Sequence, residues 1–131
     1  MPFYHISEIS KINPEVNPKM VMQTVVGEFM KVGIVTKPPG EGPPAHMHPN
    51  EEQFTLILEG KLHMILGDED RIVEKGDLIH IPRFTQHRSR AVDGPAIFFT
   101  VKFPAGDGDL NQDYNMVANA KELEKKYPGT K

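Results

Sequence analysis

The sequence contains no cysteine, and this absence excludes several kinds of chemistry at once. A chain without thiols forms no disulfide framework, carries no thiol nucleophile and binds no metal through a thiolate. Long apolar runs are also missing, because a stretch such as 96–101 is far shorter than the ~20 residues that a membrane-spanning helix needs. The first residues lack the basic and then apolar pattern of a secretory signal. We therefore expect a cytoplasmic protein that does not enter a membrane.

An excess of charge of one sign is missing as well. The chain has 15 Lys and Arg against 18 Asp and Glu, a net charge of −3, and no block of basic residues. This balance argues against nucleic acid as a partner and leaves a small molecule as the expected one. The apolar share of 38% is typical of a globular protein, and 131 residues fit one domain, 1–131.

Short apolar runs rich in Val, Ile, Phe and Thr alternate with turn residues over most of the chain. Proline and glycine, 12 and 11 in number, fall mainly between these runs. The pattern is typical of an all-β sandwich or barrel, and we predict a barrel core over about 20–104. The expected strands are 21–26, 29–36, 54–58, 62–66, 78–81 and 96–103.

The segment from about 105 to 131 has a different pattern. Apolar residues between 117 and 127 recur every three to four positions, as they do on one face of a helix. Asn119 and Glu122 fit a capping box, and Pro128 ends the pattern. We predict a C-terminal extension with one short helix, which lies either on the flank of the barrel or across its mouth.

Histidines carry the main chemical signal. His46 and His48 follow a loop rich in proline and glycine, and alternate residues of a strand point to the same face. Gln53 begins the next apolar run, and His87 begins a later one. Imidazole nitrogens are ligands for Zn, Fe, Mn, Ni and Cu, whereas an amide oxygen is a weaker, neutral ligand. The His-x-His pair alone fits a chance placement on a polar rim equally well.

The spacing around these histidines forms two motifs. Residues 40–60 have the pattern Gly-x5-His-x-His-x4-Gln-x6-Gly, which resembles the first motif of the cupin superfamily. Residues 76–87 have the pattern Gly-x5-Pro-x4-His, which resembles the second cupin motif. Phe84 and Ala91 stand where that motif usually has Gly and Asn. The resemblance covers about 20–104.

The resemblance implies an all-β, double-stranded β-helix (jelly-roll) barrel that forms a homodimer. It also implies one divalent metal ion (Zn, Mn, Fe or Ni) inside the barrel. The implied ligands are His46, His48, Gln53 and His87. Glu52 is the alternative to Gln53, but it should point to the opposite face of its strand.

Two further side chains are candidates for acid–base catalysis, Lys102 and Glu51. Thr100 and Lys102 share one face of the last predicted strand. If this face lines the cavity, Lys102 can move a proton or hold an anion, because a buried lysine shifts its pKa readily. We favour the alternative, in which the apolar face of the strand points inward and Lys102 lies on the surface.

Several other polar residues are placed by the same alternation along strands. Thr55 and Ser89 should share the inner face with the ligands. Arg88 and His63 should lie outside the barrel, in solvent or at a subunit contact, and His80 likewise.

Three functions remain. The first is a non-redox isomerase or lyase acting on an oxygen-rich small molecule, since the ligand pattern is similar to that of cupins that linearise unsaturated uronates. Those cupins also carry an Asp-x-Phe-x-Pro-x-Arg run, for which this chain has Thr100, Lys102 and Gly106 at the Asp, Phe and Arg positions. The second is a metal-dependent dioxygenase, and the third is a non-catalytic barrel that binds or senses a ligand.

Overall fold

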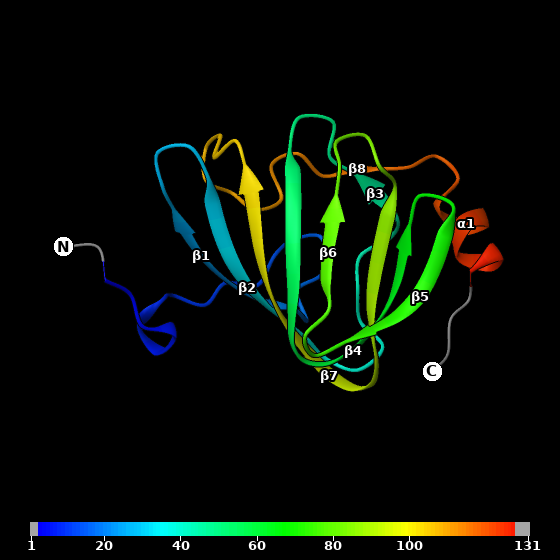
Figure 1. Ribbon diagram of the computed structural model, residues 1–131, viewed down its shortest axis with the longest axis horizontal. Coiled ribbons are helices and arrows are strands. Elements are labelled where there is room, and N and C mark those ends of the chain that lie inside the picture. Colours follow the sequence, from blue (N-terminus) through cyan, green and yellow to red (C-terminus); the bar gives the residue numbers. More distant parts are fainter. Residues whose placement is uncertain (1–2, 128–131) are drawn as a thin grey trace.

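The computed structural model describes residues 3–127, and the predicted helix stop at Pro128 lies outside them. Strands dominate the fold (Figure 1). The elements are η1 (Ile6–Glu8), β1 (Val21–Val26), β2 (Lys31–Lys37), β3 (His46–Met47), β4 (Glu52–Leu66), β5 (Glu69–Glu74), β6 (Leu78–Ile81), β7 (His87–Phe103), β8 (Asn115–Met116) and α1 (Ala120–Lys126).

Two long bent strands, β4 and β7, form the frame of the barrel. They pair antiparallel from Glu52↔Phe103 to Leu66↔His87, so each contributes to both halves of the curled sheet. The bend in β4 requires Gly60, which has a φ of 78° and whose added Cβ would lie 2.2 Å from the Pro95 oxygen. The runs predicted as strands 54–58 and 62–66 are therefore one strand that bends between them.

The shorter strands extend the two halves of the sheet (Figure 1). β1 and β2 continue from the second half of β7, and β6 pairs with the first half of β4. β5 pairs with the second half of β4, while β3 pairs with the start of β7 and with β8. The pairings are antiparallel, and the curled sheet is the predicted all-β jelly-roll barrel.

The main core lies between the two halves of the sheet. It contains Met22, Val35, Leu62, Ile81 and Phe98 among other buried apolar side chains. Burial alternates along β2 and along the first half of β4, as expected for strands with one face on this core. The inward side chains of β2 include a lysine at each end, Lys31 and Lys37.

The C-terminal helix α1 packs against the flank of the barrel, which resolves the alternative left open by the sequence. Its buried residues Ala120 and Leu123 join Ala45, Ile65 and Val117 in a second apolar cluster. Asn119 stands at the N-cap, but its side chain makes no capping hydrogen bond, so the predicted capping box is absent.

Of the alternatives for Arg88 and His63, the solvated one is wrong. Both point away from the barrel interior, yet each is only 1% exposed, because β5 and α1 cover them. Arg88 donates to Glu124 of α1 at 2.8 Å, and its other Nη lies 2.7 Å from His63 Nδ1. The sequence predicts correctly that these side chains point to the outer face of their strands. It does not predict that β5 and α1 cover this face.

The turn before β7 explains one departure from the motif. Phe84 has a φ of 63°, the left-handed region that glycine adopts most easily. The backbone therefore keeps the conformation that suits the usual glycine although a phenylalanine occupies the position.

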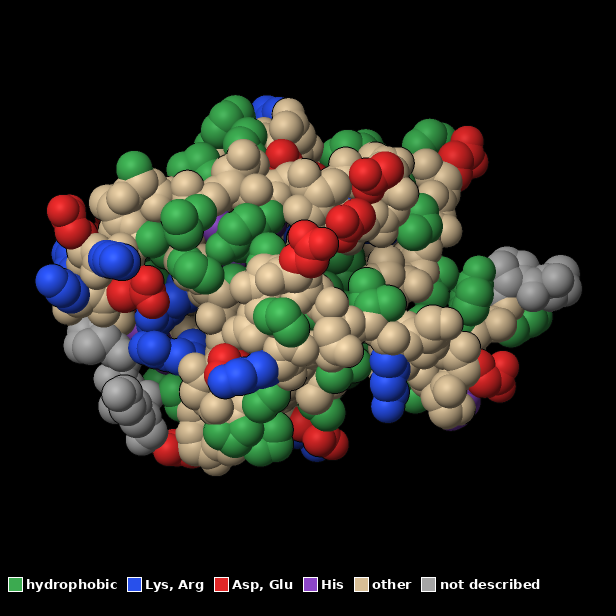
Figure 2. All heavy atoms as spheres, turned by 180° about the vertical axis from the view of Figure 1, so that it is seen from behind, with side chains coloured by type: hydrophobic (Ala, Val, Ile, Leu, Met, Phe, Trp, Pro, Cys, Tyr) green, Lys and Arg blue, Asp and Glu red, His purple; other side chains and the backbone are tan. Residues whose placement is uncertain are grey.

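The surface carries charges of both signs. Figure 2 shows Lys and Arg side chains close to Asp and Glu side chains on the rear face, with apolar side chains scattered between them. Among the described residues, no helix is both long enough and apolar enough to cross a bilayer.

Candidate metal centre

Three histidines meet at one end of the barrel. His46 of β3 is the direct cross-strand partner of His87 at the start of β7, and His48 follows β3. Ligand atoms of the three rings lie within 4.8 Å of one another, and all three side chains are buried. The geometry is that of a group that could hold a divalent ion.

The hydrogen bonds of the three rings fix which nitrogen is available. Each ring uses Nδ1 to contact a main-chain carbonyl oxygen, which can only accept a hydrogen bond, so Nδ1 carries the proton. Nε2 of each ring is then unprotonated, and its electron pair can bind a metal. The contacts are His46 to Pro44 at 2.8 Å, His48 to Asp113 at 3.0 Å and His87 to Thr85 at 2.9 Å.

The electrostatic surroundings keep these rings neutral. Burial lowers the pKa of His46 well below its usual value, and the neighbouring His87 lowers it further. Burial likewise lowers the pKa of His48 to about 3, with Lys102 adding to the effect, and that of His87 to about 4. Metal ligation needs the neutral imidazole, so the rings are in the binding form at neutral pH.

Gln53 presents an oxygen with no partner. Its Nε2 donates to Thr55 Oγ1 at 3.0 Å and to Thr100 Oγ1 at 2.8 Å. Because the Thr100 hydroxyl donates to the Phe54 carbonyl, it is free to accept from the amide and thereby sets its orientation. Gln53 Oε1 is buried without a hydrogen bond among the described residues, which fits an oxygen that faces a metal ion.

Glu52 faces the other way. Its carboxylate lies 2.7 Å from His80 on the outside of the barrel, and both side chains are about half exposed. Of the two alternatives for the fourth ligand, only Gln53 lines the same cavity as the three histidines. Its role as a ligand remains a prediction.

Lys102 lines the cavity, so the expectation that it lies on the surface is wrong. It is 5% exposed, because the inward residues of this part of β7 are the even-numbered ones that begin with Ala96 and Phe98. Its Nζ donates to the Leu110 carbonyl at 2.5 Å. Burial lowers the pKa of Lys102 to about 8, although the carboxylate of Glu51 acts in the opposite direction.

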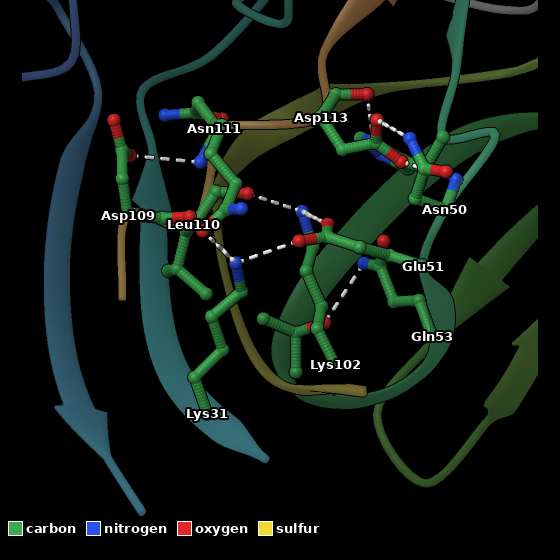
Figure 3. Close-up of polar contacts among 12 residues, drawn as sticks. Lys31, Asn50, Glu51, Gln53, Lys102, Asp109, Leu110, Asn111 and Asp113 are labelled. Atoms are coloured by element: carbon green, nitrogen blue, oxygen red, sulfur yellow. Dashed lines mark hydrogen bonds and ion pairs between the residues drawn. The ribbon is translucent and has the colours of Figure 1, made fainter. Parts of the chain in front are cut away.

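Glu51 lies between two lysines, as Figure 3 shows. Its Oε2 accepts from Lys31 Nζ at 2.6 Å, and its Oε1 lies 3.7 Å from Lys102 Nζ. Lys31 is completely buried and also donates to the Asp109 carbonyl at 2.7 Å. Glu51 is not among the residues that line the cavity, but one of its carboxylate oxygens lies within 4.8 Å of a ring nitrogen of His48.

A second group of possible ligands, His48, Glu51 and Asp113, has three of its four carboxylate oxygens engaged by hydrogen bonds. The fourth, Glu51 Oε1, is buried without a hydrogen bond among the described residues and lies 3.7 Å from Lys102 Nζ. The carboxylate of Asp113 accepts from the main-chain nitrogen of Asn50 at 2.6 Å and from the Asn50 side chain at 2.9 Å. Glu51 is the counter-charge of Lys31. The three-histidine group is therefore the better candidate for a metal.

The segment 109–114 supplies residues that no motif predicts. Asp113 holds His48 through its carbonyl oxygen, and the Tyr114 ring lies 4.4 Å from the His46 ring. Leu110 and Asn111 line the cavity. A buried aspartate in an irregular segment is the one signal that could have marked this region, but the sequence alone does not reveal its burial.

The cavity below the histidines has a volume of about 70 Å³. Its walls are largely apolar. Thr55 and Ser89 point into it, as predicted, and so does Lys37. The apolar residues that line it include Met22, Val35, Leu62, Met64, Ile79, Ile81 and Phe98.

Comparisons with known proteins agree with this architecture. The Cupin_2 family model, described as "Cupin domain", matches residues 33–102. A quercetin 2,3-dioxygenase of Bacillus subtilis (strain 168) is 30% identical over 100 residues, which cover 71% of this chain but only 27% of that protein.

Solved structures show the same fold at low sequence identity. KdgF from Halomonas sp. has a TM-score of 0.74 and 19% identity, and the match covers 82% of this chain and 97% of that one. The polyketide cyclase RemF from Streptomyces resistomycificus has a TM-score of 0.75 and 18% identity, with 96% and 92% covered.

Proposed function

The chain belongs to the cupin family, and on that premise we propose that it is a metal-dependent enzyme of the isomerase or lyase type. It would bind one divalent ion through His46, His48 and His87, with Gln53 as the fourth ligand. The substrate would be an oxygen-bearing small molecule in the cavity below the histidines.

The observation that carries this proposal is the donor set. Three neutral imidazoles and one neutral amide leave the full positive charge on a divalent ion, whereas a glutamate in place of Gln53 would cancel part of it. Such an ion polarises a carbonyl or stabilises a developing negative charge on oxygen. The uncharged donors also disfavour the loss of an electron, which favours non-redox chemistry.

Lys102 is the candidate for the group that moves a proton. It lines the cavity with the histidines, and its pKa of about 8 allows it to exist in both protonation states near neutral pH. Glu51 does not line the cavity, so we assign it a positioning role: its carboxylate stabilises the protonated form of Lys102.

A dioxygenase is the second candidate, because the chain is 30% identical over 100 residues to a quercetin 2,3-dioxygenase. The apolar cavity wall suits the ring system of such a substrate. Two points weigh against a direct transfer: the match covers only 27% of that protein, and the donor set that we propose, three histidines and Gln53, contains no carboxylate.

The two candidates differ in their need for oxygen. The protein is loaded with zinc or with iron and screened for turnover of carbonyl- and hydroxyl-bearing organic acids, unsaturated uronates and flavonols, in air and without oxygen. We expect turnover without oxygen and with either metal. Turnover that stops without oxygen would establish the dioxygenase, and binding without turnover would indicate a ligand-binding barrel.

One variant tests the role of the neutral ligand. Gln53→Glu should keep the metal and lose at least tenfold in turnover, because the carboxylate lowers the Lewis acidity of the ion. Glu52→Gln is the matched control, since this side chain faces solvent on the neighbouring position of the same strand. Full activity of Gln53→Glu would contradict the proposal.

A further inference from the structure

The cavity contains a second lysine that the chemistry above does not use. Lys37 is the last residue of β2 and is 2% exposed. By register it faces Ala96, whereas Lys31 at the other end of β2 faces Lys102. Lys37 therefore enters the cavity from the end of β2 opposite to Lys31.

The ammonium group of Lys37 connects the two halves of the sheet. It donates to the Ser89 carbonyl at 2.8 Å and to Ser89 Oγ at 2.6 Å. Ser89 lies two residues after His87 on the same face of β7, so the contact is close to the metal centre. The Phe98 ring lies 5.3 Å from Nζ and forms the adjoining apolar wall.

Lys37 differs from the other two buried lysines in its lack of a counter-charge. Lys31 and Lys102 both face Glu51, but among residues 3–127 no carboxylate lies within ion-pair distance of Lys37. An ammonium has three donors, and the described residues accept from two of them. Burial without an anion is costly, and the cost is visible in a pKa lowered to about 7.

We propose that Lys37 and Ser89 form an anion-binding subsite, and that the ligand of this cavity is an organic anion with an apolar body. Its negatively charged oxygen pairs with Lys37, and its apolar part packs against Phe98 and the surrounding aliphatic wall. The anionic group of such a ligand supplies the negative charge that the protein does not place beside the ammonium group of Lys37. The inference rests on the proposed function in one respect, because it takes this cavity to be the substrate site.

A matched pair of probes tests the subsite. Benzoate and benzamide have nearly the same shape, but only benzoate is charged at neutral pH. Their affinities are measured by titration calorimetry on the full chain after removal of metal with a chelator, so that a carboxylate cannot bind an ion. We expect the wild type to prefer benzoate by at least tenfold.

Lys37→Met should abolish this preference while it leaves the affinity for benzamide within about threefold. Lys102→Met is the control inside the same cavity, and it should retain the preference. Melting curves of both variants confirm that they are folded, which is expected because methionine fills the space of the buried lysine stem.

Three results would overturn the proposal: no detectable binding of benzoate, an unchanged preference in Lys37→Met, or a preference that Lys102→Met abolishes as completely as Lys37→Met does. A repeat with zinc-loaded protein separates this proposal from the metal assignment. If the wild type does not bind zinc, the proposed function fails. The preference of the metal-free protein for benzoate over benzamide still tests the role of Lys37 in that case.

Discussion

The Nδ1 atom of His48 lies 3.0 Å from the main-chain carbonyl oxygen of Asp113, which follows it by 65 residues. The segment after the barrel thus orients a ligand candidate in the first motif. A carbonyl on Nδ1 fixes both the tautomer and the ring orientation, and such contacts commonly change metal affinity by about 10–100-fold when they are lost.

We therefore predict that Asp113→Ala weakens metal affinity by about 10–100-fold. The carboxylate anchors the segment to Asn50 through two hydrogen bonds, so its loss frees the carbonyl that holds His48. Competition with a metal indicator measures the affinity. Asp107→Ala is the control, because among the described residues the carboxylate of this exposed aspartate accepts only from the nearby Asp109 main chain. Equal affinities of the two variants would refute the role of the anchor.

The metal assignment predicts a clear difference among histidine variants. His48→Ala and His87→Ala should each lose stoichiometric binding of a divalent ion, because each removes one of three strong donors. His80→Ala should retain it, since His80 contacts Glu52 outside the barrel. Elemental analysis of the purified proteins gives the result, and metal retained by both of the first two variants would refute the site.

Lys37 predicts an unusual dependence of stability on pH. Its pKa of about 7 in the folded protein lies below its unfolded value of 10.5, so between these values the unfolded chain binds more protons. The penalty is therefore full below pH 7 and disappears above pH 10.5, and its upper bound is roughly 5 kcal/mol at ~1.4 kcal/mol for each pKa unit.

Lys37→Met should accordingly melt at a higher temperature than the wild type at pH 6, and the difference should shrink toward pH 10. Metal-free protein is used for the comparison. Lys37 also lowers the pKa of His46 and of His87, but burial is the larger cause and keeps both rings neutral from pH 6 upward in either protein, so the difference isolates Lys37. A variant less stable than the wild type at pH 6 would mean that the bridge to Ser89 outweighs the cost of burial.

The sequence predicts the barrel from local rules, and it predicts the set of three histidines from the resemblance of two motifs to the cupin pattern. Strand alternation places His46 and His48 on one face, and proline and glycine mark the ends of the strands. Alternation does not say which face of a strand points inward. Along β7, Phe99 and Phe103 form as apolar a face as Phe98 does, so the inward position of Lys102 could not be predicted.

Contacts between distant segments are the part that the sequence does not reveal. Ser89 meets Lys37 only because the barrel closes, and Asp113 meets His48 only because the chain returns across the mouth. The burial of Arg88 likewise depends on α1, which packs over the outer face. Each of these contacts depends on the position of a whole element, and no local spacing encodes it.

The arrangement of Glu51 between Lys31 and Lys102 leads to a last prediction, about stability. Glu51→Gln keeps the shape of the side chain but leaves two buried ammonium groups without their carboxylate. Removing one partner of a buried ion pair costs on the order of 3–5 kcal/mol, and the urea midpoint of the variant should fall accordingly.

Adding Lys31→Met to Glu51→Gln should recover a large part of this loss, because it removes the fully buried ammonium that the carboxylate neutralises. The four proteins of this cycle, unfolded in urea at pH 7 without metal, give the coupling between the two residues directly. Additive effects would mean that Lys31 does not depend on Glu51 for its charge. The main role of the Glu51 carboxylate would then be to stabilise the protonated form of Lys102, the cavity residue that we propose moves the proton.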